Sequence, residues 1–457
     1  MSVSQNTLAR VVLLAAVVAG CRCPSGGCLP ATPSSPCSLE TTYADADPPE
    51  LMRLVPDCSE GACGIAPLPA WAETYQTLSV QDCQCRAATN CATANMVELE
   101  RHWAQVIIEC DSKYVALNQC LFRDLLALHA TDLRNDAAGN ALVAYYQLAG
   151  LEAQSFYLEQ AIDETQLALG RADEVTESGL PGEIDRSEIA ANLYELQDRR
   201  AQLQLKRLQL NGQLKKLLDC PLADDSLLWP RIDWQPDLAP LDVDAEVAEG
   251  LSSRPDLRGL QLVHCNLEKR TLRVARGVLS IVDGTLGAVE PTDGWVHRLR
   301  CGSCYETELP VRCRQLAMLY GDTEELATGE IKAAAYEVTM QQNRVAIARQ
   351  AVAERREQLY RLTAKRDVED TTAFEVSAQR TKLYEAEGQL IAQVVGLQAA
   401  QARLRQAKGV LAAECGFCPR LCTEGCCNGP CTQCQLPTCC KSTCECGKCK
   451  RALAKRK

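Results

Sequence analysis

A leucine heptad towards the C-terminal end of this 457-residue chain constrains the fold more than any other feature. Leucines recur every seven residues within the segment Thr372–Ala412, and small residues occupy most of the positions three residues later. The leucines are Leu383, Leu390, Leu397, Leu404 and Leu411, and the small residues are Ala386, Ala400 and Ala407, with Gln393 as the exception. Two such stripes predict a long helix that a partner helix can approach closely. Thr372 and Glu375 have capping-box spacing, which predicts where the helix begins.

The same register occurs earlier in the chain at an offset of 190 residues, as the pair Leu193 and Leu383 shows. In that earlier copy, Arg200 and Arg207 interrupt one stripe. Further identities at this offset include Leu126/Leu316, Asp132/Asp322, Gly139/Gly329, Tyr146/Tyr336, Glu164/Glu354, Tyr194/Tyr384 and Leu214/Leu404. Breakers and heptad phase coincide as well, so the sequence predicts an internal duplication. The expected fold class is all-α, with duplicated long antiparallel helical hairpins of the coiled-coil type and little or no β structure.

Composition changes and helix breakers divide the chain into six expected segments. These are a signal peptide (1–20), a Cys- and Pro-rich tether (21–77), a first hairpin repeat (78–218), a linker (219–240), a second repeat (241–412) and a Cys-rich tail (413–457). We expect helical breaks at His129–Asn140 and in a loop insertion, Ser280–Cys313, near two short strands at Leu279–Val289 and Trp295–Arg300. The first arm of the first hairpin is therefore expected to begin at Ala141.

The N-terminus has the features of an export signal. Arg10 precedes a run of ten apolar residues, and Val18-Ala19-Gly20-Cys21 resembles a bacterial lipobox. This pattern predicts that Cys21 is acylated after cleavage and anchors the chain to a membrane. The alternatives are an ordinary signal peptide or an N-terminal membrane anchor. Ten apolar residues are too few to span a bilayer, which favours the lipoprotein.

Charge and residue inventory exclude several classes of function. The net charge of −11 argues against a nucleic-acid partner. The 28 cysteines indicate an oxidising compartment, in agreement with export. Only four histidines are present, and neither a Gly-rich phosphate loop nor a nucleophile elbow can be found, so we expect no enzyme activity.

The tail carries three Cys-x-x-Cys pairs within a dense run of cysteines. They are Cys415/Cys418, Cys431/Cys434 and Cys446/Cys449. Thiolates at this spacing bind soft metals such as Zn²⁺ or Cu⁺. A disulfide-stapled module is the alternative, and an exported chain favours it. The loop insertion offers the same choice. A zinc ion could be bound there by His297, Cys301, Cys304 and Cys313. The alternative, which we favour, is one disulfide beside an unrelated histidine.

The order of motifs resembles the bacterial outer-membrane efflux protein family, the TolC type. Leu241 to Glu249 followed by Arg254-Pro-Asp-Leu-Arg258 is similar to the opening of that family's second half, and Leu78 to Asp82 is a weaker version of its first-half opening. Gly179-Leu180 followed by Asp185 resembles the family's hairpin-tip turn. Glu330 to Tyr336 resembles its second ascending helix. The resemblance covers about Leu78 to Ala412.

The resemblance implies a homotrimer whose hairpins form a tube in the periplasm. It implies partners as well: a periplasmic adaptor that docks at the hairpin tips and an inner-membrane transporter. The tip residues are Leu180, Pro181, Gly182, Asp185, Asp370, Thr371, Thr372 and Glu375. With acylated Cys21, the chain would be lipid-anchored in the outer membrane and face the periplasm.

This chain departs from the family in its membrane region. Family members insert two pairs of strands per protomer, whereas the twelve residues of His129–Asn140 cannot hold two strands of about 9–11 residues. Three functions are therefore open. The sequence favours a periplasmic duct of a transport or secretion system. The alternatives are a structural envelope lipoprotein that cross-links partners through its helices and cysteines, and a metal-binding protein that uses the tail.

Overall fold

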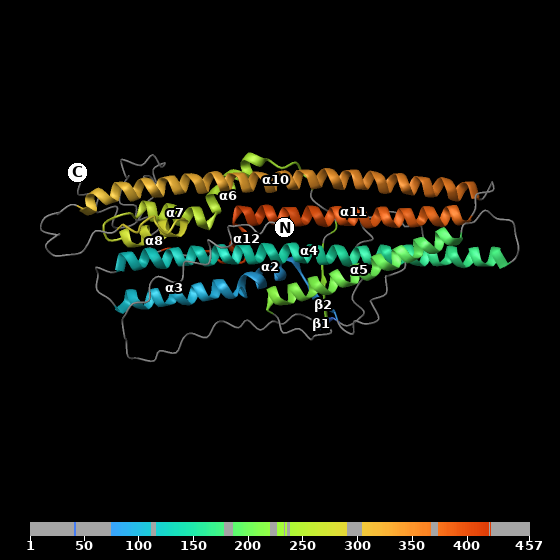
Figure 1. The fold of residues 1–457 in the computed structure, drawn as a ribbon, viewed down its shortest axis with the longest axis horizontal. Coiled ribbons are helices and arrows are strands. Elements are labelled where there is room, and N and C mark those ends of the chain that lie inside the picture. The colour runs from blue at the N-terminus through green and yellow to red at the C-terminus, as the bar shows by residue number, and fades with distance from the viewer. Residues whose placement is uncertain are drawn as a thin grey trace.

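Four long helices lie side by side along the long axis of the molecule (Figure 1). They are α4 (Ala116–Glu177), α5 (Arg186–Leu218), α10 (Cys304–Arg366) and α11 (Ala373–Lys408). The computed structural model describes residues 41–42, 75–110, 116–177, 186–219, 226–232, 234, 238–289, 304–366, 373–419 and 421. The predicted all-α fold of duplicated antiparallel hairpins is confirmed, because α4–α5 and α10–α11 form two such hairpins.

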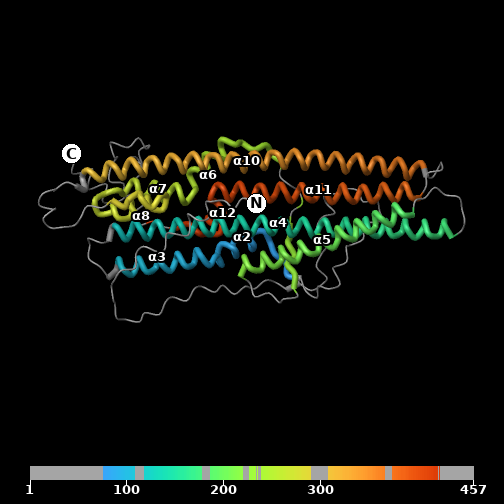
Figure 2. The backbone as a smooth tube through the Cα atoms, in the orientation of Figure 1, coloured from blue at the N-terminus to red at the C-terminus, as the bar shows by residue number. Residues whose placement is uncertain are grey.

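The four helices form one layer in the order α5, α4, α11 and α10. Helix α4 packs against both α5 and α11, and α11 packs in turn against α10. Figure 2 shows the same spatial order of the four helices in the backbone trace. Helices α5 and α10 therefore form the two edges of the layer.

The predicted leucine heptad faces the centre of this layer. All five leucines are buried, and Leu397 and Leu411 are fully so. Small residues allow α4 and α11 to approach closely: a Cβ atom on Gly139 would lie 2.3 Å from the side chain of Gln406. The prediction of a helix that packs tightly along its leucine face is thus confirmed.

Shorter helices lie beside α4 and α10 beyond the ends of α5 and α11, and they extend the duplication (Figure 1). Helices α2 (Val80–Thr89) and α3 (Ala92–Cys110) precede α4, while α6 (Val243–Ser253), α7 (Pro255–Cys265) and α8 (Leu272–Val282) precede α10. Ser79 caps α2 and Asp242 caps α6, each through its side-chain oxygen. The offset between these two caps is 163 residues, shorter than that between the long helices. The second repeat therefore gains its extra length between α7 and α10, the stretch that contains α8.

A small sheet lies against α4. It has the order β1 (Thr41–Thr42), β2 (Tyr75–Leu78) and β3 (Leu227–Pro230), with β1–β2 antiparallel and β2–β3 parallel. The hydroxyl of Tyr145 in α4 donates to the carbonyl of Leu78 at 2.9 Å, and Tyr145 is fully buried. Strand β3 belongs to the expected linker, which thus ties both ends of the first repeat together.

Four predicted boundaries differ from the structure. The loop insertion predicted at Ser280–Cys313 is too long at both ends, because α8 continues to Val282 and α10 begins at Cys304. The break at His129–Asn140 is wrong, because α4 runs through it without interruption. The strand at Leu279–Val289 is wrong, because Leu279 to Val282 end α8 and the residues after them form turns. The heptad helix ends at Lys408 instead of Ala412, since Gly409 has a φ of +76° and begins a new turn. Residues Trp295–Arg300 lie outside the described residues.

None of the helices in the described part of the chain combines the length and the apolar character that crossing a membrane requires.

Candidate functional site

The ends of α4 and α10 and the starts of α5 and α11 lie at one end of the layer, opposite the shorter helices α7 and α8 (Figure 1). Glu375 is in the first turn of α11. Beside the first tip, Arg186 at the start of α5 pairs with Asp173 of α4. Leu180, Pro181, Gly182, Asp185, Asp370, Thr371 and Thr372 lie outside the described residues, as do Cys21, His297, Cys301, Cys431, Cys434, Cys446 and Cys449.

The outward edge of α10 carries a stripe of exposed apolar side chains. Its members are at helical spacing and each is more than half exposed: Val311, Met318, Tyr336, Met340 and Ile347. The same face is hollowed by a shallow groove around Gly329 and Ala333. A row of apolar and small residues on an unpaired helix face is typical of a surface that another helix covers.

The outward edge of α5 has the same character. Tyr194, Leu205 and Leu208 are all more than half exposed and fall on one helical stripe. Gly212 continues that stripe, and no atom lies within 4 Å of the position its Cβ would take. Both edges of the layer therefore carry a stripe of exposed apolar side chains, and they belong to different helices.

A groove of about 330 Å³ opens on one face of the layer, where α5 and α11 flank α4. Tyr157 and Leu158 of α4 form part of its lining, and Gly388 of α11 leaves room above Tyr157. Arg199 of α5 and Glu385 of α11 pair across it at 3.6 Å. This ion pair links α5 to α11 across the groove.

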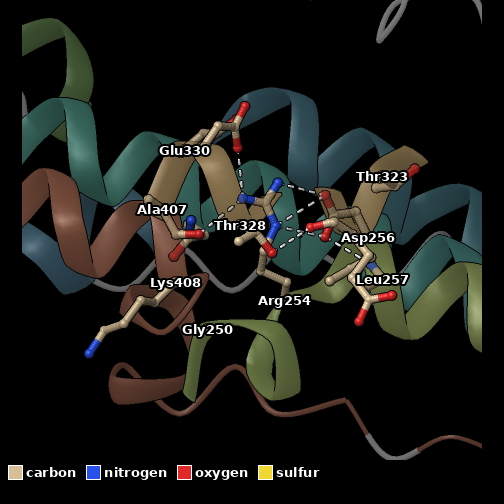
Figure 3. A network of polar contacts seen from close by, with 12 residues as sticks. Gly250, Arg254, Asp256, Leu257, Thr323, Thr328, Glu330, Ala407 and Lys408 are labelled. Atoms are coloured by element: carbon tan, nitrogen blue, oxygen red, sulfur yellow. Dashed lines mark hydrogen bonds and ion pairs between the residues drawn. The ribbon is translucent and has the colours of Figure 1, made fainter. Parts of the chain in front are cut away.

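A polar network fixes the end of α11 to the shorter helices (Figure 3). Arg254, at the α6–α7 junction, donates to Asp256, to Glu330 of α10 and to the carbonyl of Ala407, at 2.7, 2.8 and 3.1 Å. Lys408 pairs with Glu246 and Glu249 of α6 at 2.5 and 2.8 Å. The free carbonyls at the end of α11 thus find partners, as a buried helix terminus requires. Arg254 and Asp256 belong to the motif that carried the family resemblance.

The residues after α11, 409–419, form what we name the C-terminal strap. Gly409 N donates to Gln406 O and Val410 N to Arg405 O, which is the bonding of a Schellman turn. Helix α12 (Leu411–Glu414) follows and ends in a second turn of the same type, where Gly416 has a φ of +86°. These two glycines reverse the chain twice within a few residues.

Side chains from three helices hold the C-terminal strap in place. Asn135 of α4 donates to Gln406 O at 2.9 Å and accepts from Leu411 N at 3.1 Å. Gln84 of α2 donates to Leu411 O at 2.9 Å and to Glu414 at 2.8 Å, and Glu414 also pairs with Arg405. The contacts of Asn135 and Gln84 join residues more than 270 positions apart.

Two further contacts complete the attachment. A disulfide joins Cys85 of α2 to Cys415. The guanidinium of Arg134 lies 4.4 Å above the ring of Phe417. This arrangement was not predicted from the sequence, in which Gly409 and Gly416 are visible only as helix breakers.

The cysteines proposed as metal ligands are only partly described. Cys415 is in the disulfide with Cys85, whereas Cys418 is an exposed free thiol. Cys313 is disulfide-bonded, and its Sγ lies 3.4 Å from Nε2 of His264. Cys304 is the first residue of α10. Within the described ranges, no three or more His, Cys, Asp or Glu side chains are grouped so as to hold a metal ion.

Comparison with known proteins returns outer-membrane channels. No protein-family model matches the chain. No curated protein matches either. Among solved structures, the Campylobacter jejuni CmeC outer membrane channel is 13% identical, with 65% of this chain and 67% of that chain covered and a TM-score of 0.48. CusC is 14% identical over 72% of this chain and 95% of that chain, with a TM-score of 0.48.

The Neisseria gonorrhoeae MtrE outer membrane channel is 13% identical over 72% of this chain and 88% of that chain, again with a TM-score of 0.48. These structures are of the type that the sequence motifs resemble.

Proposed function

We propose that this chain is the duct-forming subunit of a transport or secretion system in the bacterial cell envelope. Three copies close into a tube in the periplasm, and the acylated Cys21 holds the tube at the outer membrane. A periplasmic adaptor and an inner-membrane transporter meet the hairpin tips. Cargo passes through the tube passively, driven by the inner-membrane partner.

The open four-helix layer is the observation that supports this proposal. Its two edges, α5 and α10, each carry a stripe of exposed apolar side chains and are unlike each other. Contact between unlike edges of successive copies is heterologous, and such contacts close into a ring when the rotation between copies allows it. A single copy, with α5 and α10 at opposite edges of the layer, encloses no lumen.

The exposed apolar residues of the two edges also lie at similar levels along the long axis of the layer. Lys206 of α5 and Gly388 of α11 line one groove, and the neighbouring Glu387 pairs with Arg356 of α10 at 3.0 Å. Because α5 and α10 run in opposite directions, the levels of Leu208 and Ile347 along the long axis differ by no more than about two helical turns. In a ring, apolar residues of α5 would therefore meet apolar residues of α10.

The length of the two longest helices supports the same function. Helix α4 has 62 residues and α10 has 63, which correspond to about 93 Å at about 1.5 Å per residue. Helices of this length give a tube that extends far from a membrane into the periplasm.

An edge variant tests the ring. Ile347→Glu places a charge on the α10 edge and is expected to convert the assembly to single copies, since a buried unpaired carboxylate is strongly unfavourable. The measurement is the mass of the detergent-purified chain by light scattering. Leu167→Glu is the matched control, because Leu167 is 57% exposed on α4, away from both edges. An unchanged mass for Ile347→Glu would reject these edges as the interface.

The transport role has its own test. Deleting the gene is expected to raise the sensitivity of the cell to exported toxic compounds, and the unmodified gene should restore resistance. Unchanged sensitivity across a broad panel of toxicants would count against transport. Substituting Cys21 with alanine should move the protein from the membrane to the soluble periplasmic fraction, and no change in fractionation would reject the lipid anchor.

A further inference from the structure

Three cysteines lie where the C-terminal strap meets α2. Cys85 and Cys415 form a disulfide, and Cys415 also begins the Cys415-Gly-Phe-Cys418 pair. Cys418 is a free, exposed thiol. One disulfide and one accessible thiol are therefore held on the same short segment, which is the minimum that thiol–disulfide exchange requires.

Backbone hydrogen bonds and a tight turn fix Cys418 three residues after the disulfide-bonded Cys415. Gly416, with a φ of +86°, turns the chain back after α12, and Cys418 N donates to Gly416 O at 3.0 Å. The Cys418 thiol lies 3.9 Å from the carbonyl oxygen of Ala413, at the end of the helix that carries Cys415. Phe417, packed on Arg134, fixes the segment between the two cysteines.

The nearby Cys83 thiol is a poor nucleophile by comparison. It is fully buried in α2 and donates to the carbonyl of Ala141 at 3.6 Å. Burial, together with the neighbouring Asp82 charge, raises the pKa of the Cys83 thiol well above its ordinary value. The thiolate is the reactive form, and among the free cysteines in the described part of the chain Cys418 is the exposed one.

We propose that Cys85, Cys415 and Cys418 form an exchange site that attaches the C-terminal strap to α2 and can release it. The Cys418 thiolate attacks Sγ of Cys415, an S–S bond forms between Cys415 and Cys418, and the bond from Cys415 to Cys85 breaks. Cys85 leaves as a thiolate and takes up the proton that Cys418 lost. The number of disulfides is unchanged, so no oxidant or reductant is needed.

Exchange moves the covalent link without removing the polar contacts. Before exchange, the chain that follows Cys415 is bonded to α2; after it, the link lies wholly within the strap. Gln84, Arg405 and Glu414 still hold α12 by hydrogen bonds and charge. These contacts favour the Cys85–Cys415 bond, because they keep α12 beside α2. The balance between the two bonds should therefore respond to Glu414.

Peptide mapping of the full-length protein tests the proposal. The protein is quenched with acid, its free thiols are alkylated, and the peptides joined through Cys85–Cys415 and Cys415–Cys418 are quantified by mass spectrometry. We expect a minor Cys415–Cys418 form in the unmodified protein. Glu414→Ala should raise its share by up to about fivefold, since an exposed ion pair contributes up to about 1 kcal/mol and that amount changes an equilibrium by about fivefold.

Control variants distinguish disulfide exchange from a general weakening of the contacts between the strap and α2. Cys418→Ser should leave the Cys85–Cys415 bond alone, with Cys85 protected from alkylation. Cys83→Ala should behave as the unmodified protein, because Cys83 takes no part. Glu195→Ala, which removes an exposed carboxylate on α5, should not change the share. Absence of the Cys415–Cys418 form from both the unmodified protein and Glu414→Ala would overturn the proposal.

Discussion

Glu152 of α4 and Arg207 of α5 form an ion pair in which the side chains are only 7% and 3% exposed. Arg207 occupies a position where the leucine register of the duplicated helix is interrupted, so the first hairpin carries a charge in its packed face. Burial raises the pKa of Glu152 to about 7, although the Arg207 charge and hydrogen bond act in the opposite direction. Breaking such a pair would leave a buried charge without a partner.

This pair predicts a pH dependence of stability. A carboxyl whose pKa rises on folding, here from 4.5 to about 7, binds more protons in the folded chain than in the unfolded chain between those values. Its contribution to the free energy of unfolding is therefore fully present below about pH 4.5 and is lost as pH rises through about 7. Thermal unfolding followed by circular dichroism between pH 5 and 8 should show this loss.

Glu152→Gln should flatten that pH profile, because the amide does not ionise. Burial also raises the pKa of Glu387, which pairs with Arg356, so the variant with both Glu152→Gln and Glu387→Gln should be flatter still. A profile for Glu152→Gln that matches the unmodified protein would show that Glu152 does not titrate in this range.

Leu397 tests the packing of the heptad. It is fully buried in the centre of the layer, and Leu397→Ala should lower the free energy of unfolding by about 2–5 kcal/mol through lost burial and a cavity. Leu167→Ala is the control, since Leu167 is 57% exposed and should change stability by less than about 0.5 kcal/mol. Equal effects of the two substitutions in denaturant titrations would contradict the described packing.

Gly409 tests the turn that ends α11. A Cβ at this position would lie 3.0 Å from Cδ of Pro255 and 3.1 Å from Cα of Arg254, in a backbone conformation with φ of +76°. Gly409→Ala should therefore destabilise the chain by about 1–2 kcal/mol from backbone strain alone. Gly170→Ala should instead stabilise it by about 0.5–1 kcal/mol, because Gly170 is inside a helix with open space around its Cβ. Thermal melts of both variants check the two opposite signs.

Arg254 tests the network at the end of α11. Arg254→Ala removes the donors to Asp256, Glu330 and the Ala407 carbonyl, and should cost about 2 kcal/mol, as for lost hydrogen bonds to charged groups. Arg254→Lys should recover part of this loss, because lysine keeps the charge but lacks the planar fork. Full recovery by lysine in denaturant titrations would show that charge alone is sufficient.

The long helices could be predicted from the sequence because their signal is local and repeated. The leucine heptad and its copy fix which face is buried, and the structure buries those leucines. The error at His129–Asn140 has a physical cause. Asn135 and Gly139 read as helix breakers, yet their roles are tertiary: Asn135 binds the strap and Gly139 makes room for Gln406.

The attachment of the strap could not be predicted in this way. Its partners, such as Gln84 and Leu411, are 327 residues apart, and no periodicity connects them. The pairing of Cys85 with Cys415 is equally hidden, because 28 cysteines allow too many combinations for spacing to decide. The apolar edges of α5 and α10 likewise became visible only when the order of helices in the layer was known.

The oligomeric mass of the unmodified full-length chain tests the central claim most directly. Light scattering on the protein purified in mild detergent should give the mass of three chains, because only closure between the α5 and α10 edges of successive copies produces a lumen. A trimer would make conductance across a lipid bilayer the next measurement. A mass of one chain would contradict the duct, since a single open layer of four helices cannot enclose a path for cargo.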